Sequence, residues 1–185
     1  RGATSEGMEA LVAVLETNSC FADGVQVVTG CTFGNNALIY RDYGKTAMTL
    51  VSRENPDAGV RIHVKEREEI IDRDYPEARE LFDRVIGEGE GTPADRERLT
   101  EVWTEVAFDL IDRPITDLCD VETAVSVALP DRAPKFEDVI CTECGESIMA
   151  PKALERGGET YCRDCADASY LQLDGRGLTR IDPAE

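Results

Sequence analysis

The first apolar segment of the chain predicts a buried strand that is followed by a short helix. Leu11–Leu15 is an uninterrupted run of apolar, mostly branched residues, and such a run is typical of a strand that is buried on both faces. From Ala22 to Thr29 the apolar residues fall at helical spacing, and Gly30 follows, a residue type that commonly ends helices. We therefore expect a strand that leads directly into a helix.

Alternating positions predict three more strands, over residues 37–41, 46–53 and 59–65. The links between them are rich in turn-forming residues, so an antiparallel meander is the natural arrangement. The third strand alternates most regularly, and this places His63, the only histidine of the chain, on its polar face. We expect His63 to face solvent rather than to act in catalysis.

Two helices and a last strand follow these strands. The first helix has an apolar stripe between Pro76 and Gly87, and the second begins with a capping-box pattern at Thr92–Asp95 and stops before Pro114. Residues 121–129 alternate again and predict a core strand. The whole pattern predicts an α+β fold, with a mixed or antiparallel sheet and helices packed on it.

The sequence also predicts how the chain is organised into domains. Residues 1–130 are expected to form the core domain, residues 131–140 a proline-spaced linker, and residues 141–175 a small module that contains two pairs of cysteines.

The charge of the chain excludes one class of partner. It has 20 basic and 38 acidic residues, a net charge of −18, which repels the phosphate backbone that nucleic-acid-binding proteins neutralise with Lys and Arg. No apolar run is long enough to cross a bilayer, and the first 20 residues lack the pattern of a signal peptide. We expect a cytoplasmic protein without nucleic-acid or membrane partners.

Most of the acid lies in the middle of the chain. Residues 66–140 contain nine basic and 22 acidic residues, a net charge of −13, and only 4 of the 20 basic residues of the chain are Lys. This composition is expected of a protein that must stay hydrated in strong salt, or of a genome whose codon usage favours Arg.

Four cysteines give the most specific chemical signal. Two C-x-x-C pairs are separated by 17 residues, a spacing at which four thiolates can surround a tetrahedral zinc ion. A closed site of this kind leaves no open position for substrate, so we expect a structural role. The predicted zinc ligands are Cys141, Cys144, Cys162 and Cys165.

Three further features indicate the type of zinc finger. Gly145 follows the first cysteine pair as in a zinc knuckle, Gly157-Gly158 predicts a hairpin, and a helix is expected from Cys162 to about Tyr170. Together they indicate a treble-clef finger. Because acidic residues outnumber basic ones in this module, contact with protein is expected rather than contact with nucleic acid.

The other three cysteines form a weaker pattern. Cys20 follows the buried strand and precedes the helix, a position that suits a nucleophile or a second metal ligand, with Cys31 near the far end of the same segment. The alternative is that both are small buried core residues, as free cysteines commonly are. Cys119 is expected to be a core residue.

One string of residues resembles a known family. Its pieces are Glu16–Cys20, Asp23, Thr29–Thr32, Gly34 and Arg41–Lys45, and in this order they resemble the FmdE family, which takes its name from a component of formylmethanofuran dehydrogenase. Many members of that family carry a C-terminal treble-clef finger. The resemblance implies an α+β core, a metal or thiol site around Cys20, and a homodimer.

The chain departs from that family at its start. Family members have a helix preceded by a His-and-Cys motif that ends in Cys-Pro-Gly and contributes to the site with Cys20, and Arg1–Ala10 resembles no such motif. We therefore expect the core to lack its N-terminal helix and the site to be half complete.

Three hypotheses for function remain open. The first, by resemblance, is a zinc-binding accessory protein of formylmethanofuran dehydrogenase, or of one-carbon or molybdoenzyme metabolism, with other protein subunits as partners. The second is a metal- or thiol-dependent enzyme that acts on a small substrate in a cleft formed by Cys20, Asp23, Cys31 and Lys45. The third is a protein-interaction module that acts through its finger.

Overall fold

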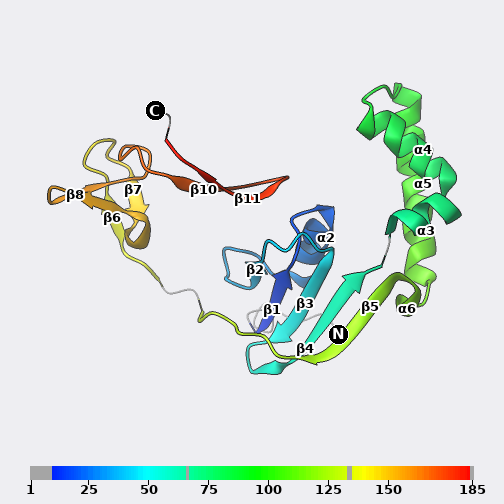
Figure 1. The fold of residues 1–185 in the computed structure, drawn as a ribbon, viewed down its shortest axis with the longest axis horizontal. Coiled ribbons are helices and arrows are strands. Elements are labelled where there is room, and N and C mark those ends of the chain that lie inside the picture. The colour runs from blue at the N-terminus through cyan, green and yellow to red at the C-terminus, as the bar shows by residue number, and fades with distance from the viewer. Residues whose placement is uncertain (1–9, 66, 133–134, 184–185) are drawn as a thin grey trace. The chain divides into compact units, whose positions relative to one another are not determined.

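A computed structural model gives the structure of the chain and describes residues 10–65, 67–132 and 135–183. Figure 1 shows the course of the chain. The chain divides into two compact units. The first contains residues 1–60 and 124–185, and the second contains residues 61–123. Among the described helices, none combines the length and the apolar character that a membrane span requires.

The main sheet is mixed, as predicted. Its strands are β1 (Leu11–Leu15), β2 (Leu38–Tyr40), β3 (Ala47–Ser52), β4 (Asn55–Val64) and β5 (Cys119–Val125), in the order β2-β1-β3-β4-β5. β1 pairs in parallel with β2 and antiparallel with β3. The prediction of a simple meander was wrong for β2, because this strand follows a helical crossover and lies on the other side of β1 from β3.

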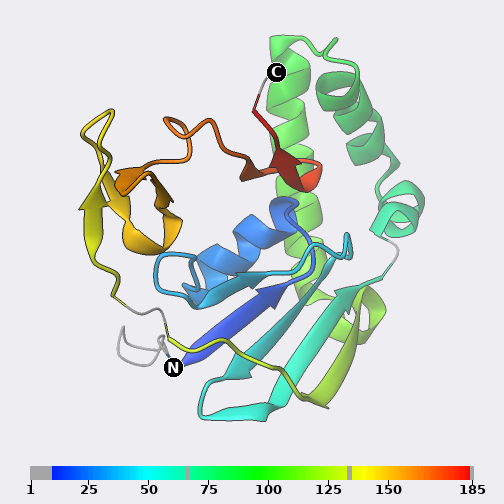
Figure 2. The ribbon, with the colours of Figure 1, turned by 60° about the vertical axis from the view of Figure 1, so that its left-hand side comes forward.

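β1 is buried on both faces, as its uninterrupted apolar run predicts. The four residues Val12–Leu15 are at most 2% exposed. Ala13 and Leu15 pack in a cluster with α2 (Cys20–Thr29), and Val12 and Val14 pack on the opposite face with Val51 and Val127. Figure 2 shows α2 lying across one face of the sheet.

α2 is the short helix that the sequence predicts, with a start two residues earlier. Its apolar residues Ala22 and Val25 are buried against β1. It ends at Gly30, whose left-handed φ of 69° suits glycine and whose N–H donates a hydrogen bond to the carbonyl oxygen of Gln26. This strand–helix–strand unit makes β1 and β2 parallel, and it decides which loops meet at each edge of the sheet.

The second unit is mainly helical. Its elements are α3 (Arg67–Asp74), α4 (Pro76–Phe82), a π-helical turn (Asp83–Gly87), α5 (Pro93–Asp112) and α6 (Ile115–Leu118). The predicted capping box is present, since Thr92 and Asp95 exchange side-chain and backbone hydrogen bonds. The predicted stripe before Gly87 is only partly inside: Ala78 and Leu81 are buried, whereas Ile86 is 57% exposed.

The predicted core strand at 121–129 is only partly correct. β5 ends at Val125, and Val121 is 43% exposed, whereas Val127 beyond its end is buried. β5 is the last strand of the sheet order, and alternation shows which residues share a face but not whether another layer covers that face.

The cysteine module consists of short hairpins. β6 (Asp138–Ile140) pairs with β7 (Ser147–Met149), and after a 3₁₀ turn (Ala150–Lys152) β8 (Leu154–Arg156) pairs with β9 (Glu159–Tyr161). The predicted Gly157-Gly158 hairpin is confirmed, with positive φ at both glycines.

The predicted helix from Cys162 to Tyr170 is not formed. The segment is one turn, in which the Ala166 N–H donates to the Cys162 carbonyl oxygen at 2.9 Å, and Asp167 then adopts a left-handed φ of 45°. An additional hairpin follows, formed by β10 (Tyr170–Asp174) and β11 (Gly177–Ile181).

Candidate functional site

The four cysteines of the two C-x-x-C pairs come from two turns. The first turn lies between β6 and β7, where Gly145 adopts a positive φ of 74° and donates its N–H to the Cys141 carbonyl oxygen. The second turn follows β9. A backbone hydrogen bond of 2.8 Å from Thr142 to Thr160 holds the two segments together.

The geometry of the four thiols fits a tetrahedral metal ion. All four sulfur atoms lie within 4.8 Å of one another. A Zn–S bond of about 2.3 Å would place the sulfurs of a tetrahedral site about 3.8 Å apart, so small side-chain adjustments suffice. The four thiols supply every ligand of such a site, so the arrangement is closed and suits a structural role.

The electrostatics of this cluster agree with a ligand role. Backbone N–H groups of Cys144 and Cys162 lower the pKa of Cys141 to about 6, whereas hydrogen bonding with Cys162 raises the pKa of Cys165. Hydrogen bonding within the cluster thus shifts the pKa values of these thiols in opposite directions. A bound cation would displace the thiol protons, since thiolates are the ligand form.

A second candidate site lies where β1 and β2 end. Because these strands are parallel, the segments after them, residues 16–20 and 41–45, meet at one edge of the sheet, which we call the carboxyl edge. Two backbone hydrogen bonds fix this meeting: the Arg41 N–H donates to the Leu15 carbonyl oxygen at 2.8 Å, and the Lys45 N–H donates to the Glu16 carbonyl oxygen at 3.0 Å. Ligands commonly bind at such an edge in sheets with parallel strands.

Three of the predicted site residues belong to the carboxyl edge or to the helix that starts there. Cys20 is the first residue of α2 and is exposed, Asp23 is exposed in the first turn of the same helix, and Lys45 is exposed in the segment after β2. The edge thus offers a thiol, a carboxylate and an ammonium group to solvent. These groups can pair with a charged small molecule.

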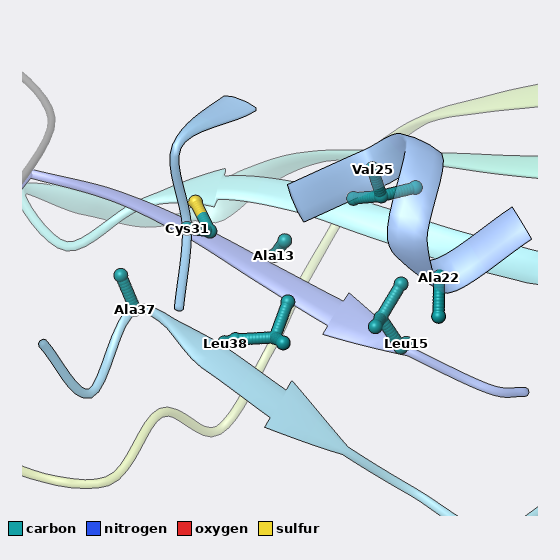
Figure 3. Close-up of a cluster of buried hydrophobic side chains, with 7 residues drawn as sticks. All are labelled: Ala13, Leu15, Ala22, Val25, Cys31, Ala37 and Leu38. Carbon is teal, nitrogen blue, oxygen red and sulfur yellow. The ribbon is translucent and has the colours of Figure 1, made fainter. Parts of the chain in front are cut away.

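Cys31 is not brought to this edge. It follows the far end of α2, and ten helical residues span about 15 Å. Cys31 is 1% exposed, packs in a cluster with Ala13 and Leu38, and donates its thiol to the Leu11 carbonyl oxygen at 3.6 Å. Figure 3 shows its side chain among the buried apolar residues. Cys31 is therefore a buried core residue, which is the alternative that the sequence left open for it.

Two polar residues of the carboxyl edge were not predicted as site residues. Tyr40 donates its hydroxyl to Asp42 Oδ1 at 2.6 Å, which raises the pKa of Tyr40 to about 12 and lowers the pKa of Asp42. Asn18 lies in the facing segment. Asn18 and Asp42 lie in the pieces Glu16–Cys20 and Arg41–Lys45 of the family-like string, and this position is the signal that could have identified them. From these two pieces the sequence predicts only Cys20 and Lys45 as site residues.

The remaining histidine and cysteine lie elsewhere. The His63 side chain is 41% exposed and its Nδ1 lies 3.8 Å from Asp120 Oδ2, so it faces solvent as predicted. Cys119 is half-buried rather than fully inside the core, and burial raises the pKa of its thiol.

Two protein families match this chain. The family described as "FmdE, Molybdenum formylmethanofuran dehydrogenase operon" matches residues 2–120. The family described as "Prokaryotic dksA/traR C4-type zinc finger" matches residues 134–171. The second match contains all four cysteines of the thiol cluster.

A curated protein and a solved structure are also similar. A protein of Archaeoglobus fulgidus described as a probable S-adenosyl-L-methionine-binding protein is 41% identical over 174 residues, which is 94% of this chain. The chain spans only 45% of that relative's length. The crystal structure of a tungsten formylmethanofuran dehydrogenase FmdE-like protein from Syntrophus aciditrophicus is 26% identical, with a TM-score of 0.50, over 84% of this chain and 71% of that one.

Proposed function

The chain belongs to the FmdE family and carries a C4-type zinc finger near its C-terminal end, and on this premise we propose that it is a zinc-containing accessory protein of one-carbon metabolism that binds a small molecule at the carboxyl edge. The observation that carries the proposal is this edge, where two backbone hydrogen bonds hold the segments after β1 and β2 together. The exposed Cys20 and Lys45 belong to these segments.

We infer that the metal of the finger is zinc. Four thiolates in a closed tetrahedral arrangement are the donor set of structural zinc sites, and the sulfur separations fit this geometry. Zinc would contribute folding free energy to a module with little apolar core. Because such a closed site has no open position, the small molecule would bind at the carboxyl edge and not at the metal.

The names of the two relatives support one-carbon metabolism as the setting. One name refers to formylmethanofuran dehydrogenase and the other to S-adenosyl-L-methionine, and the formyl group and the transferable methyl group each contain a single carbon atom. We propose S-adenosyl-L-methionine as the small molecule. Its carboxylate can pair with Lys45, and its amino group can pair with Asp23.

Titration calorimetry of the zinc-loaded full chain with S-adenosyl-L-methionine tests this proposal. We expect saturable binding, and Lys45→Ala should weaken it about tenfold because the ligand carboxylate loses its cation. The matched control is Lys152→Ala, which removes an exposed ammonium group from the finger and should leave the affinity unchanged. Absence of binding to the wild-type chain, or equal weakening by both variants, would contradict the proposal.

The accessory role needs a separate measurement. We expect immobilised protein to bind purified formylmethanofuran dehydrogenase complex reversibly in biolayer interferometry. Absence of binding to that complex, together with intact ligand binding, would remove the accessory role and leave a small-molecule-binding protein.

A second candidate is an enzyme that uses Cys20. The observation that favours it is the exposure of this thiol at the first residue of α2, a position that suits a nucleophile. The two candidates differ in one outcome: a binding protein returns the ligand unchanged, whereas an enzyme converts it and Cys20→Ser abolishes the conversion without abolishing binding.

A further inference from the structure

The β10–β11 hairpin contacts the carboxyl edge through two hydrogen bonds. The Asn18 side-chain amide donates to the carbonyl oxygen of Asp174. The Leu178 N–H donates to Asp42 Oδ2 at 2.8 Å. The edge therefore binds two backbone groups of the hairpin: Asn18 binds a carbonyl oxygen, and Asp42 binds an N–H group.

These two bonds lie on either side of the hairpin turn. Asp174 is the last residue of β10 and pairs with Gly177, the first residue of β11, so that Gly175 and Arg176 form a two-residue turn. Leu178 follows directly. The carboxyl edge thus holds both strands of the hairpin at the turn, which fixes the direction of the turn as well as its position.

The shape of the turn fits Asp42 closely. Gly177 has a positive φ of 104°, and a Cβ atom at this position would lie 2.5 Å from Asp42 Oδ2. Any other residue would therefore meet both backbone strain and a steric clash. By contrast, a Cβ atom at Gly175 would meet no atom within 4 Å.

A residue of the sheet orients Asp42. Its Oδ1 accepts the Tyr40 hydroxyl at 2.6 Å, and Tyr40 ends β2 and packs against the apolar cluster of the core. The other carboxylate oxygen is therefore directed by a residue of the sheet itself. A group that is fixed in this way loses little freedom when it accepts the Leu178 N–H.

The hairpin is also tied to the cysteine cluster. Only residues 166–169 separate Cys165 from β10, and Arg163 Nη1 donates to the Ser169 carbonyl oxygen at 2.7 Å. The Ala168 N–H donates to the Arg163 carbonyl oxygen at 2.9 Å. The turn that carries the second cysteine pair thus sets the start of the hairpin.

We infer that Asn18 and Asp42 form a clasp that holds the turn of the C-terminal hairpin on the carboxyl edge, and that metal binding by the four cysteines keeps this clasp closed. The occupant is the hairpin of the same chain. The inference stands on the contacts of the hairpin and is independent of the small molecule proposed above.

Amide hydrogen exchange by NMR on the zinc-loaded full chain tests the clasp. The Leu178 amide should be protected in the wild-type protein. Asp42→Ala should speed its exchange at least tenfold, while the other protected amides of the hairpin keep their rates. Asp42→Asn, which retains an acceptor oxygen, should show a smaller increase. Unchanged protection of Leu178 in Asp42→Ala would overturn the clasp.

A glycine pair provides the matched control. Gly177→Val should release the turn and expose Leu178 to exchange, whereas Gly175→Ala should leave its rate within twofold of wild type. Metal content measured on each variant confirms that the finger is intact. Equal exchange rates of the Leu178 amide in the two variants would show that the steric fit between Gly177 and Asp42 does not hold the turn in place.

Metal removal tests the second half of the inference. Treatment with EDTA should speed exchange at Leu178 at least tenfold, while amides of β1 keep their rates. If Leu178 stays protected in protein that has lost its metal, the clasp closes without the finger and the coupling is wrong.

Discussion

The strand β1 and the four-cysteine finger differ in what holds them together. Val12–Leu15 are at most 2% exposed and pack between two apolar clusters. Among the described residues of 138–169, only Cys141 and Ala166 are buried to a similar degree. Apolar burial stabilises the strand, whereas the finger has little of it, as is typical of small modules that a bound metal ion stabilises.

Two cysteines show the same contrast on the scale of single residues. Cys31 and Cys141 are each 1% exposed. Cys31 lies among apolar side chains and serves the core as a small apolar group, whereas Cys141 lies within 4.8 Å of three other thiols. Burial alone therefore does not separate a core cysteine from a ligand. The number of neighbouring donors does.

Loss of one cysteine ligand should have the strongest effect on the protein. Cys144→Ser should lose most of the bound zinc and unfold the finger, because structural zinc contributes about 10–16 kcal/mol to modules of this kind. Amides of the β1 core should remain protected. Elemental analysis together with amide exchange measures both effects, with Cys119→Ser as the control. A Cys144→Ser protein that retains one zinc ion per chain would show that this thiol is not a ligand.

A smaller effect is expected from the cysteine pair at the two ends of α2. Cys31→Ala should lower the free energy of unfolding by about 1–2 kcal/mol, since it leaves a small cavity in a packed cluster. Cys20→Ala removes an exposed thiol and should change it by less than about 0.5 kcal/mol. Chemical denaturation followed by circular dichroism gives both values. Equal losses in the two variants would mean that Cys20 is as well packed as Cys31.

A change in salt concentration should have the weakest effect. It tests how much charge repulsion, as opposed to packing, limits the stability of the protein. Residues 66–140 carry a net charge of −13, from nine basic and 22 acidic residues, and their mutual repulsion is screened as ionic strength rises. We expect the melting temperature to rise by about 2–4 °C between low salt and about 1 M sodium chloride. A melting temperature that stays flat or falls would show that this repulsion does not limit stability.

Features that depend on neighbouring residues could be predicted from the sequence. Three features of this kind are the capping box of α5, the glycine that ends α2, and each C-x-x-C pair. In each of them the residues that define the feature lie within a few positions of one another, so that local spacing specifies the geometry. The burial of β1 was also predictable, since an unbroken apolar run has no polar face to expose.

Features that depend on distant partners could not be predicted in the same way. The position of β2 beside β1 depends on the path of α2, and the exposure of β5 depends on whether another layer covers this last strand of the sheet. Cys20 and Cys31 lie only eleven positions apart, and the helix between them separates them. The contacts of Asn18 and Asp42 involve residues more than 130 positions away, which no local pattern indicates.

The bond from Leu178 to Asp42 spans 136 positions of the chain, and this separation has a consequence in time. Ribosomes add about 5–20 residues per second, so Asp42 is synthesised about 7–27 s before its partner Leu178. During this interval β1 and α2 can already pack together while Asn18 and Asp42 have no contact with the hairpin. The side chains of the clasp are therefore open to water and to other binding partners during synthesis, before the hairpin reaches them.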